Sequence, residues 1–171
     1  MLKGIEMIYC DMDGVLCDFD RAIFEIDGKT RIEDLREGDP ELDLWKHIQK
    51  QGNIAKFYTD LEWHPEGKKL WNYLQDLVNV EILTSLGGSN PDKEGARYGK
   101  EIWLKNRNID VPLNFSQKAA NKQFWVNNKN DVLIDDYEPN IRQWNQAGGI
   151  GIFFTTAAEV IEKLNGLKER N

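Results

Sequence analysis

Three groups of oxygen-bearing side chains follow short apolar stretches of this chain, and their types suit phosphoryl chemistry. In chain order the groups are Asp11 with Asp13, Thr84 with Ser85, and Asp135 with Asp136. Four carboxylates brought together repel one another unless a hard cation is bound, and Mg²⁺ prefers oxygen ligands. Hydroxyl groups and a lysine would complete the set by binding phosphoryl oxygens and offsetting negative charge. The residue types therefore indicate metal-supported phosphoryl transfer, if the fold brings the groups together.

The apolar stretches alternate with helical patterns, which is typical of a parallel sheet covered on both faces. Strands are predicted at residues 5–10, 80–84, 111–115, 132–134 and 151–154, and helices at 65–77, 98–106, 140–147 and 158–164. The carboxyl ends of parallel strands share one edge of the sheet, and ligands bind beyond that edge. We therefore predict a three-layer α/β/α fold, with the three polar groups meeting at the carboxyl edge.

Within such a site Asp11 is the candidate nucleophile and Asp13 the candidate general acid and base. Asp11 would attack phosphorus, and Asp13 would protonate the leaving oxygen and then activate water. Thr84 would donate a hydrogen bond to the phosphoryl oxygens, with Ser85 beside it as a further phosphate-binding candidate. The expected Mg²⁺ ligands are Asp11, Asp13 through its main-chain carbonyl, Asp135 and Asp136.

Residues 18–62 interrupt the alternation of strands and helices. The segment is charge-rich and contains a turn at Asp27-Gly28, with helices predicted at 19–26 and 42–50. We predict a core domain of residues 1–17 and 63–171, with a small helical cap of residues 18–62 inserted after the first strand. Four aromatic residues of this cap are candidates to stack on a nucleobase, although a small cap also needs large side chains for its own core: Phe19, Trp45, Phe57 and Tyr58.

The amino-acid composition limits the kinds of partner that the protein is expected to bind. The 171 residues contain 22 Lys+Arg and 29 Asp+Glu, a formal net charge of −7, which argues against a polymeric nucleic acid as partner. No apolar run approaches the ~20 residues that span a bilayer, and residues 1–6 lack the apolar stretch of a signal peptide. Cys10 and Cys17 form neither a disulfide framework nor a zinc pattern. We expect a cytoplasmic protein and make no prediction of its oligomeric state.

Several of these stretches resemble the motifs of one family, the haloacid dehalogenase (HAD) superfamily. The run Asp11-Met12-Asp13-Gly14-Val15-Leu16 resembles its first motif, Thr84-Ser85 its second and Leu133-Ile134-Asp135-Asp136 its fourth. With Cys17-Asp18-Phe19 and the turn Pro65-Glu66-Gly67, the chain is similar to the 5′(3′)-deoxyribonucleotidase group. The resemblance implies a Rossmann-like fold with a helical cap after the first strand. It also implies Mg²⁺-dependent hydrolysis of (deoxy)nucleoside monophosphates through an aspartyl-phosphate.

Two details depart from the family pattern or stay open. The nucleotidase group has Thr-Ser-Pro where this chain has Thr84-Ser85-Leu86. The third-motif lysine is either Lys118 or Lys122. Lys122 is slightly favoured, because it stands three residues before Trp125, the register at which family members carry an aromatic residue.

Other functions remain as alternatives. A phosphatase of another small ester, such as a sugar phosphate, uses the same catalytic groups, and a non-catalytic binding protein can keep the same fold. A dehalogenase is disfavoured because it has no use for Asp13 or for a metal. His47 and His64 are predicted at the surface. Lys100, Lys105 and Arg107 are predicted on a solvated helix face.

Overall fold

A computed structural model describes residues 4–36 and 43–168 of the chain. Contacts divide the chain into two compact units, which are described one at a time. The first unit contains Met1–Cys17, Trp63–Gly88 and Val111–Asn171, and the second contains Asp18–Glu62 and Ser89–Asp110. The predicted cap, residues 18–62, lies in the second unit. Residues 89–110 were predicted in the core domain, whereas their contacts group them with the second unit.

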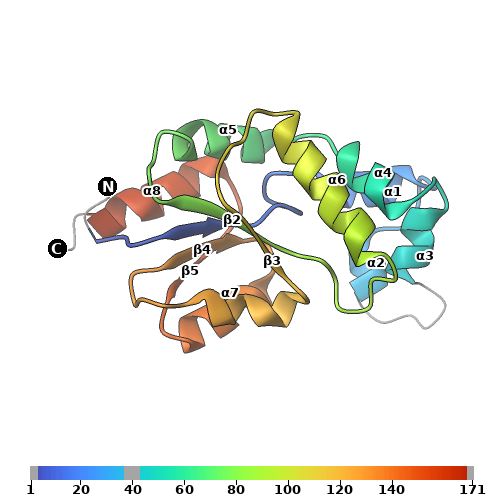
Figure 1. Cartoon of the computed structure of the whole chain (residues 1–171). Coiled ribbons are helices and arrows are strands. Elements are labelled where there is room, and N and C mark those ends of the chain that lie inside the picture. The colour runs from blue at the N-terminus through green and yellow to red at the C-terminus, as the bar shows by residue number, and fades with distance from the viewer. Residues whose placement is uncertain (1–3, 37–42, 169–171) are drawn as a thin grey trace. The chain divides into compact units, whose positions relative to one another are not determined.

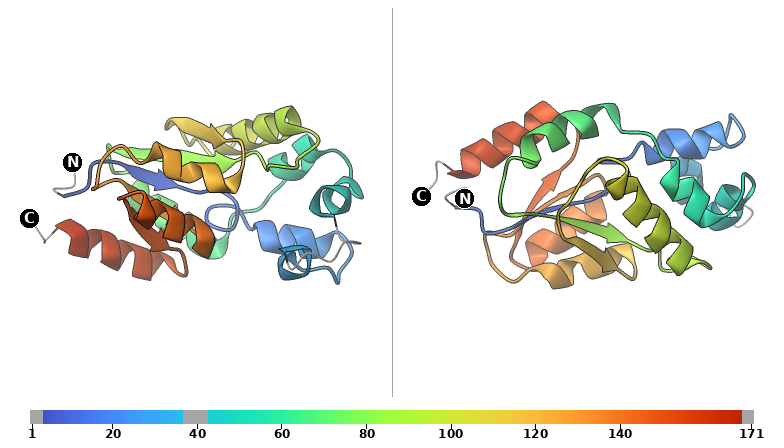
Figure 2. Two further views of the ribbon diagram at one scale, coloured as in Figure 1. Left: turned by 90° about the horizontal axis from the view of Figure 1, so that it is seen from below. Right: turned by 45° about the horizontal axis from the view of Figure 1, so that its top comes forward.

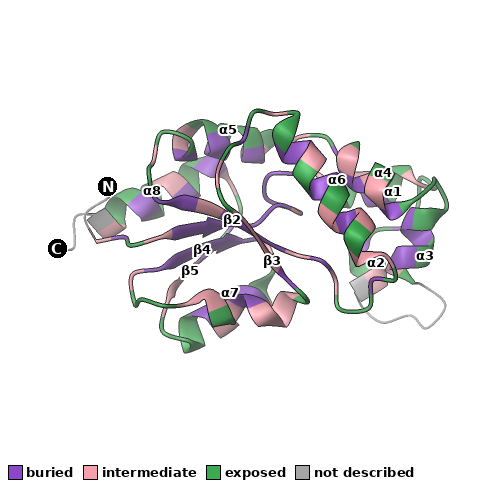
Figure 3. Ribbon diagram, in the orientation of Figure 1, coloured by how far each residue is buried: buried purple, intermediate pink, exposed green. Residues whose placement is uncertain are grey.

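The first unit is built on a parallel sheet with the strand order β3-β2-β1-β4-β5 (Figure 1). Its strands are β1 (Ile8–Cys10), β2 (Val80–Ser85), β3 (Leu113–Ser116), β4 (Val132–Asp135) and β5 (Ile150–Phe153). Strands β1 and β4 are buried along their whole length, as Figure 3 shows, which explains why both are almost entirely apolar. The predicted parallel α/β sheet is confirmed, although β1 begins three residues later than the stretch 5–10 suggested.

Helices cover both faces of this sheet (Figures 1 and 2). Helices α5 (Pro65–Leu74) and α8 (Ala157–Lys168) pack together on one face, and α7 (Glu138–Gln146) packs with the 3₁₀ helix η1 (Ala119–Trp125) on the other. Because side chains alternate along a strand, Tyr9 and Leu133 point to the α7 face, where they contact Ile141 and Trp144. The Tyr9 and Trp144 rings meet edge to face at 5.4 Å. Packing in this core therefore determines which side chains of β1 and β4 point to the face of the sheet that α7 and η1 cover.

Helix α5 fixes the loop that follows β1. His64 precedes the helix as its N-cap, and its Nδ1 accepts the backbone N–H groups of Glu66 and Gly67. His64 is therefore half-buried, and the prediction of a surface residue was wrong. A Cβ atom on Gly67 would lie 2.0 Å from the carbonyl oxygen of Val15. Glycine is therefore required where α5 crosses this loop.

The second unit is helical. It contains α1 (Phe19–Glu25), α2 (Ile32–Arg36), α3 (Leu44–Gln49), α4 (Ile54–Thr59) and α6 (Lys93–Lys105). Helices α4 and α6 pack so closely that a Cβ on Gly99 would lie 2.5 Å from the carbonyl oxygen of Ala55. The Trp103 indole donates to the carbonyl oxygen of Leu61 at 2.7 Å. These contacts explain why residues 89–110 belong to this unit. In the described ranges, no helix has the length and apolar character needed to cross a bilayer.

Three polar side chains of the second unit are more buried than predicted. His47 is 3% exposed, and its Nε2 lies 2.9 Å from the carbonyl oxygen of Ile23. Lys100 is fully buried, with its ammonium 4.6 Å from the centre of the Tyr58 ring, and Arg107 is half-buried. The predictions of a surface histidine and a solvated helix face were therefore wrong for these residues, because aromatic and backbone partners from distant segments cover them. The predicted helix start at residue 42 lies outside the described residues.

Candidate active site

Asp11 and Asp135 lie side by side because β1 and β4 are neighbouring parallel strands. The register pairs Cys10 with Ile134, and the Asp11 amide donates to the carbonyl oxygen of Ile134 at 3.0 Å. Asp11 is 6% exposed and Asp135 is fully buried. The sheet thus brings together two carboxylates that are more than 120 residues apart in the sequence.

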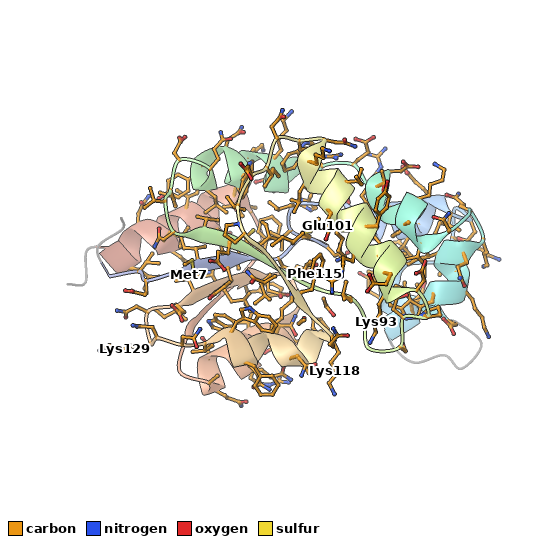
Figure 4. The ribbon with its side chains drawn as sticks, viewed as in Figure 1. Met7, Lys93, Glu101, Phe115, Lys118 and Lys129 are labelled. Atoms are coloured by element: carbon orange, nitrogen blue, oxygen red, sulfur yellow. The ribbon has the colours of Figure 1, made fainter. Side chains whose placement is uncertain are left out.

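Lys122 lies between these two carboxylates. Its ammonium is 2.8 Å from Asp11 Oδ1 and 2.7 Å from Asp135 Oδ2, and the residue is only 2% exposed. Lys118, labelled in Figure 4 near the carboxyl end of β3, is exposed, and its Cβ lies next to Gly88. Of the two lysines that the sequence left open, the structure brings Lys122 into contact with Asp11 and Asp135.

Two buried carboxylates, those of Asp11 and Asp135, share the single ammonium group of Lys122, and the pKa values of Asp11 and Lys122 are shifted. Burial raises the pKa of Asp11 to about 7. Lys122 acts in the opposite direction, and the neighbouring carboxylate of Asp135 raises the pKa further. Burial disfavours the charge on Lys122, but Asp11 and Asp135 outweigh this effect and raise its pKa. Burial also raises the pKa of the Cys10 thiol, and this fully buried side chain packs as a small core residue.

A third carboxylate, that of Asp136, completes an oxygen cluster. Asp11, Asp135 and Asp136 each offer a ligand atom, and these atoms lie within 4.8 Å of one another. A Cβ on Gly14 would lie 2.2 Å from Asp136 Oδ2, and Gly14 has a φ of +77°. Glycine at this position therefore leaves space for the third carboxylate. Three carboxylates at this spacing are the donor set that a hard divalent cation prefers.

Asp13 lies in the loop that follows Asp11, and its negative charge acts to raise the pKa of Asp11. It is half-buried, and its backbone forms an isolated bridge with Cys17. The tight loop between them is closed by the Gly14 amide, which donates to the carbonyl oxygen of Cys17 at 3.0 Å. These backbone contacts therefore fix the conformation of the loop that follows Asp11 and carries Asp13.

The carboxyl end of β2 supplies the hydroxyl groups. Thr84 is fully buried and Ser85 is half-buried, and Ser85 Oγ accepts the Gly87 amide at 3.1 Å. On the neighbouring strand, Ser116 pairs with Ser85, and its Oγ is buried without a hydrogen-bond partner among the described residues. Ser116 was not among the predicted site residues. It directly follows the predicted strand 111–115, and that position was the signal that could have placed it at the carboxyl edge.

The four aromatic residues proposed for base stacking all lie in the second unit, and three of them contact one another. The Phe19 ring is 5.6 Å from that of Phe57 and 6.2 Å from that of Tyr58, centre to centre. Phe57 is half-buried and lines a cavity of about 230 Å³ within this unit. Trp45 is not part of this aromatic trio, and its indole donates to Ser89 Oγ at 3.1 Å.

No protein-family model matches the chain, but its fold resembles solved structures. A HAD-superfamily hydrolase of subfamily IA from Geobacter sulfurreducens PCA has a TM-score of 0.56 and 13% identity, over 95% of this chain and 97% of that one. A haloacid dehalogenase-like hydrolase from Streptococcus pneumoniae has a TM-score of 0.55 and 15% identity, over 93% and 90%. A dehalogenase with an intermediate complex has a TM-score of 0.58 and 12% identity, over 91% and 87%.

These likenesses show the fold. At such low identity they carry no substrate or activity to this chain. The predicted HAD-like α/β architecture is confirmed. The resemblance to the deoxyribonucleotidase group remains a prediction.

Proposed function

We propose that the chain is a Mg²⁺-dependent phosphomonoesterase that hydrolyses (deoxy)nucleoside monophosphates through an aspartyl-phosphate on Asp11. The observation that carries this proposal is the buried contact of Lys122 with Asp11 and Asp135 at 2.8 and 2.7 Å. A nucleophilic carboxylate beside a fixed cation suits attack on a phosphate ester, because the cation offsets the negative charge of the incoming group.

The residues support a two-step displacement. The Asp11 carboxylate attacks phosphorus, a new bond forms between its oxygen and phosphorus, and the bond from phosphorus to the ester oxygen breaks. Asp13 gives its proton to the departing alcohol oxygen. Asp13 then takes a proton from water, whose oxygen attacks the acyl phosphate, releasing inorganic phosphate and restoring Asp11. Lys122 and the hydroxyl groups of Thr84 and Ser85 bind the phosphoryl oxygens in this proposal.

Mg²⁺ is proposed to be held by the side chains of Asp11, Asp135 and Asp136 and by the main-chain carbonyl of Asp13. The fit rests on the three carboxylate oxygens within 4.8 Å of one another. A bound Mg²⁺ neutralises charge on the phosphoryl group and makes it a better electrophile. A bound Mg²⁺ would also share with Lys122 the compensation of the negative charge on these carboxylates.

The proposed substrate is a nucleoside monophosphate in the cytoplasm. The catalytic groups recognise only phosphate, so selectivity depends on other residues, and Phe19, Phe57, Tyr58 and Trp45 are the proposed contributors. Aromatic faces stack on bases at about 1–3 kcal/mol per base. A net charge of −7 favours such a small ester over polymeric nucleic acid.

A phosphate-release assay over a panel of monophosphates, with and without Mg²⁺, tests the function. We expect Mg²⁺-dependent release that is faster for nucleoside monophosphates, including deoxy forms, than for hexose or glycerol phosphates. Phe57→Ala should raise KM for the nucleotide and leave turnover of a small aryl phosphate nearly unchanged, because only the first has a base to stack.

Other outcomes of the same assay would replace this proposal. Faster hydrolysis of sugar phosphates would keep the phosphatase activity and reject the nucleotidase. Release of halide from a 2-haloacid without release of phosphate would indicate a dehalogenase. Failure to turn over any ester with saturating Mg²⁺ would indicate a binding protein.

A further inference from the structure

Asn140 contacts the carboxylate of Asp135 directly. It lies in the first turn of α7, is 5% exposed, and its Nδ2 donates to Asp135 Oδ2 at 2.9 Å. The same oxygen accepts Lys122 at 2.7 Å, and the other oxygen accepts the Tyr137 amide at 2.8 Å. Asp135 is therefore held by three donors, one from η1 and two from the start of α7.

These three hydrogen bonds matter because the carboxylate group of an aspartate otherwise rotates about its terminal torsion. Rotation about the terminal torsion of Asp is soft and roughly two-fold, so a single hydrogen bond does not fix the plane of the group. The Tyr137 amide and the Asn140 amide hold opposite oxygens. A carboxylate has about four acceptor positions, so three donors leave about one for a cation.

The chemical type of residue 140 is also informative. Asp11, Asp135 and Asp136 already bring three carboxylates within 4.8 Å, with Lys122 as their buried counter-ion. An amide donates a hydrogen bond to Asp135 without adding a fourth negative charge. Asn140 therefore orders the cluster at no electrostatic cost.

We propose that Asn140 is a positioning residue for Asp135, which it holds in the orientation that binds a divalent cation. Its contribution is to preform the site, so that less side-chain ordering accompanies ion binding. The proposal rests on the proposed function only in taking these carboxylates as the cation ligands. It makes no use of the substrate.

The test is the affinity for Mg²⁺ alone, measured by isothermal titration calorimetry without substrate. Residues that orient a metal ligand typically change metal affinity by roughly 10–100-fold. We expect Asn140→Leu, which keeps the size of the side chain and removes its donor, to weaken Mg²⁺ binding by about that factor. Asn140→Ser, which is too short to reach Oδ2, should act in the same direction and is the second variant if the first does not fold.

The matched control is Asn145→Leu on the same helix. Asn145 likewise makes a side-chain hydrogen bond, in which its Oδ1 accepts the Gly151 amide at 2.6 Å, but it is exposed and lies five residues further along α7. We expect it to lower thermal stability without changing Mg²⁺ affinity. In a phosphatase assay, the Asn140 variants should need more Mg²⁺ for half-maximal rate and regain most of kcat at saturation.

The outcomes separate the two proposals. Wild-type protein that binds no Mg²⁺ would reject the metal site and with it the proposed function. Wild-type binding that Asn140→Leu and Asn140→Ser leave unchanged would reject the positioning role alone. Equal weakening by Asn145→Leu would show that the effect comes from general loss of stability, and would reject it as well.

Discussion

The two units use the same side chain, aspartate, in opposite ways. In the first unit Asp11 and Asp135 are buried and face a cation, and burial raises the pKa of Asp11 to about 7. In the second unit the Asp27 side chain is 17% exposed. It accepts hydrogen bonds from the Thr30 hydroxyl and amide and from the Lys29 amide, and the Thr30 hydroxyl contributes most to lowering its pKa.

Helix starts show the same contrast. Asp43, Asn53 and Asp92 each accept backbone N–H groups at the first turn of α3, α4 and α6. A carboxylate that satisfies a helix start stabilises local structure and is well solvated. A carboxylate buried beside other carboxylates is held at a cost in stability. The difference suggests that the first unit maintains a reactive cluster, while the aspartates of the second unit maintain its helices.

The largest expected effect comes from one isosteric substitution made in both units. Asp11→Asn removes the proposed nucleophile and should lower phosphatase kcat by roughly four or more orders of magnitude. Asp92→Asn should leave both kcat and stability nearly unchanged, because Asn and Asp cap helices about equally well. Steady-state kinetics and thermal unfolding of the two variants provide the measurement. Substantial activity of Asp11→Asn would contradict the assignment of the nucleophile.

A smaller loss is expected at Asp13. If it transfers the proton to and from the reacting oxygens, Asp13→Asn should slow kcat by roughly 10²–10⁴-fold and change KM less. Mg²⁺ binding should persist, because the proposed ligand at this position is the main-chain carbonyl. A change confined to KM would instead indicate a structural role in the loop that Gly14 closes.

The sequence predicted the first unit well because its chemistry lies next to its strands. Asp11, Thr84 and Asp135 each sit at or just after the end of an apolar stretch, and parallel topology alone then brings them to one edge. The choice between Lys118 and Lys122 required the fold. The local sequence favoured Lys122 only slightly, through its spacing from Trp125, and the fold shows that this lysine of η1 reaches Asp11 and Asp135 on the neighbouring strands.

The second unit was harder to predict because its contacts join distant segments. Helix α6 was expected at residues 98–106, yet it begins at Lys93, where the Asp92 side chain accepts the Gly95 amide. Its packing on α4 depends on Gly99 meeting Ala55, and the burial of Lys100 depends on Tyr58. Asn140 was missed for a similar reason. Its partner Asp135 is identified only when α7 is placed against β4.

The pH dependence of stability should have opposite signs in the two units. The pKa of Asp11 is raised on folding, so its favourable contribution is full below about pH 4, the pKa of an unfolded Asp, and is lost as pH rises to about 7. The pKa of Asp27 is lowered, so its contribution is present above about pH 4 and is lost as pH falls further.

Urea unfolding between pH 3 and pH 8, in buffer with a chelator, measures this difference. Asp11→Asn should gain stability relative to the wild type as pH rises from about 4 to 7, because it lacks the carboxylate that is costly to ionise. Asp27→Asn should lose stability relative to the wild type above about pH 4 and converge with it in acid. Parallel profiles for the two variants would contradict the contrast between the units.

The smallest expected effect is the loss of one helix cap. Asp92 Oδ1 accepts the Gly95 amide at 2.8 Å, and Asp92→Ala leaves that donor at the start of α6 without its partner. We expect a loss of about 1 kcal/mol in the free energy of unfolding, with most of it restored by Asp92→Ser. Chemical denaturation of the three proteins measures it, and kcat per folded molecule should stay at the wild-type value at saturating Mg²⁺ and substrate. A loss of kcat without a loss of stability would mean that Asp92 acts in the reaction, and the separation between reactive and structural aspartates would then fail at this position.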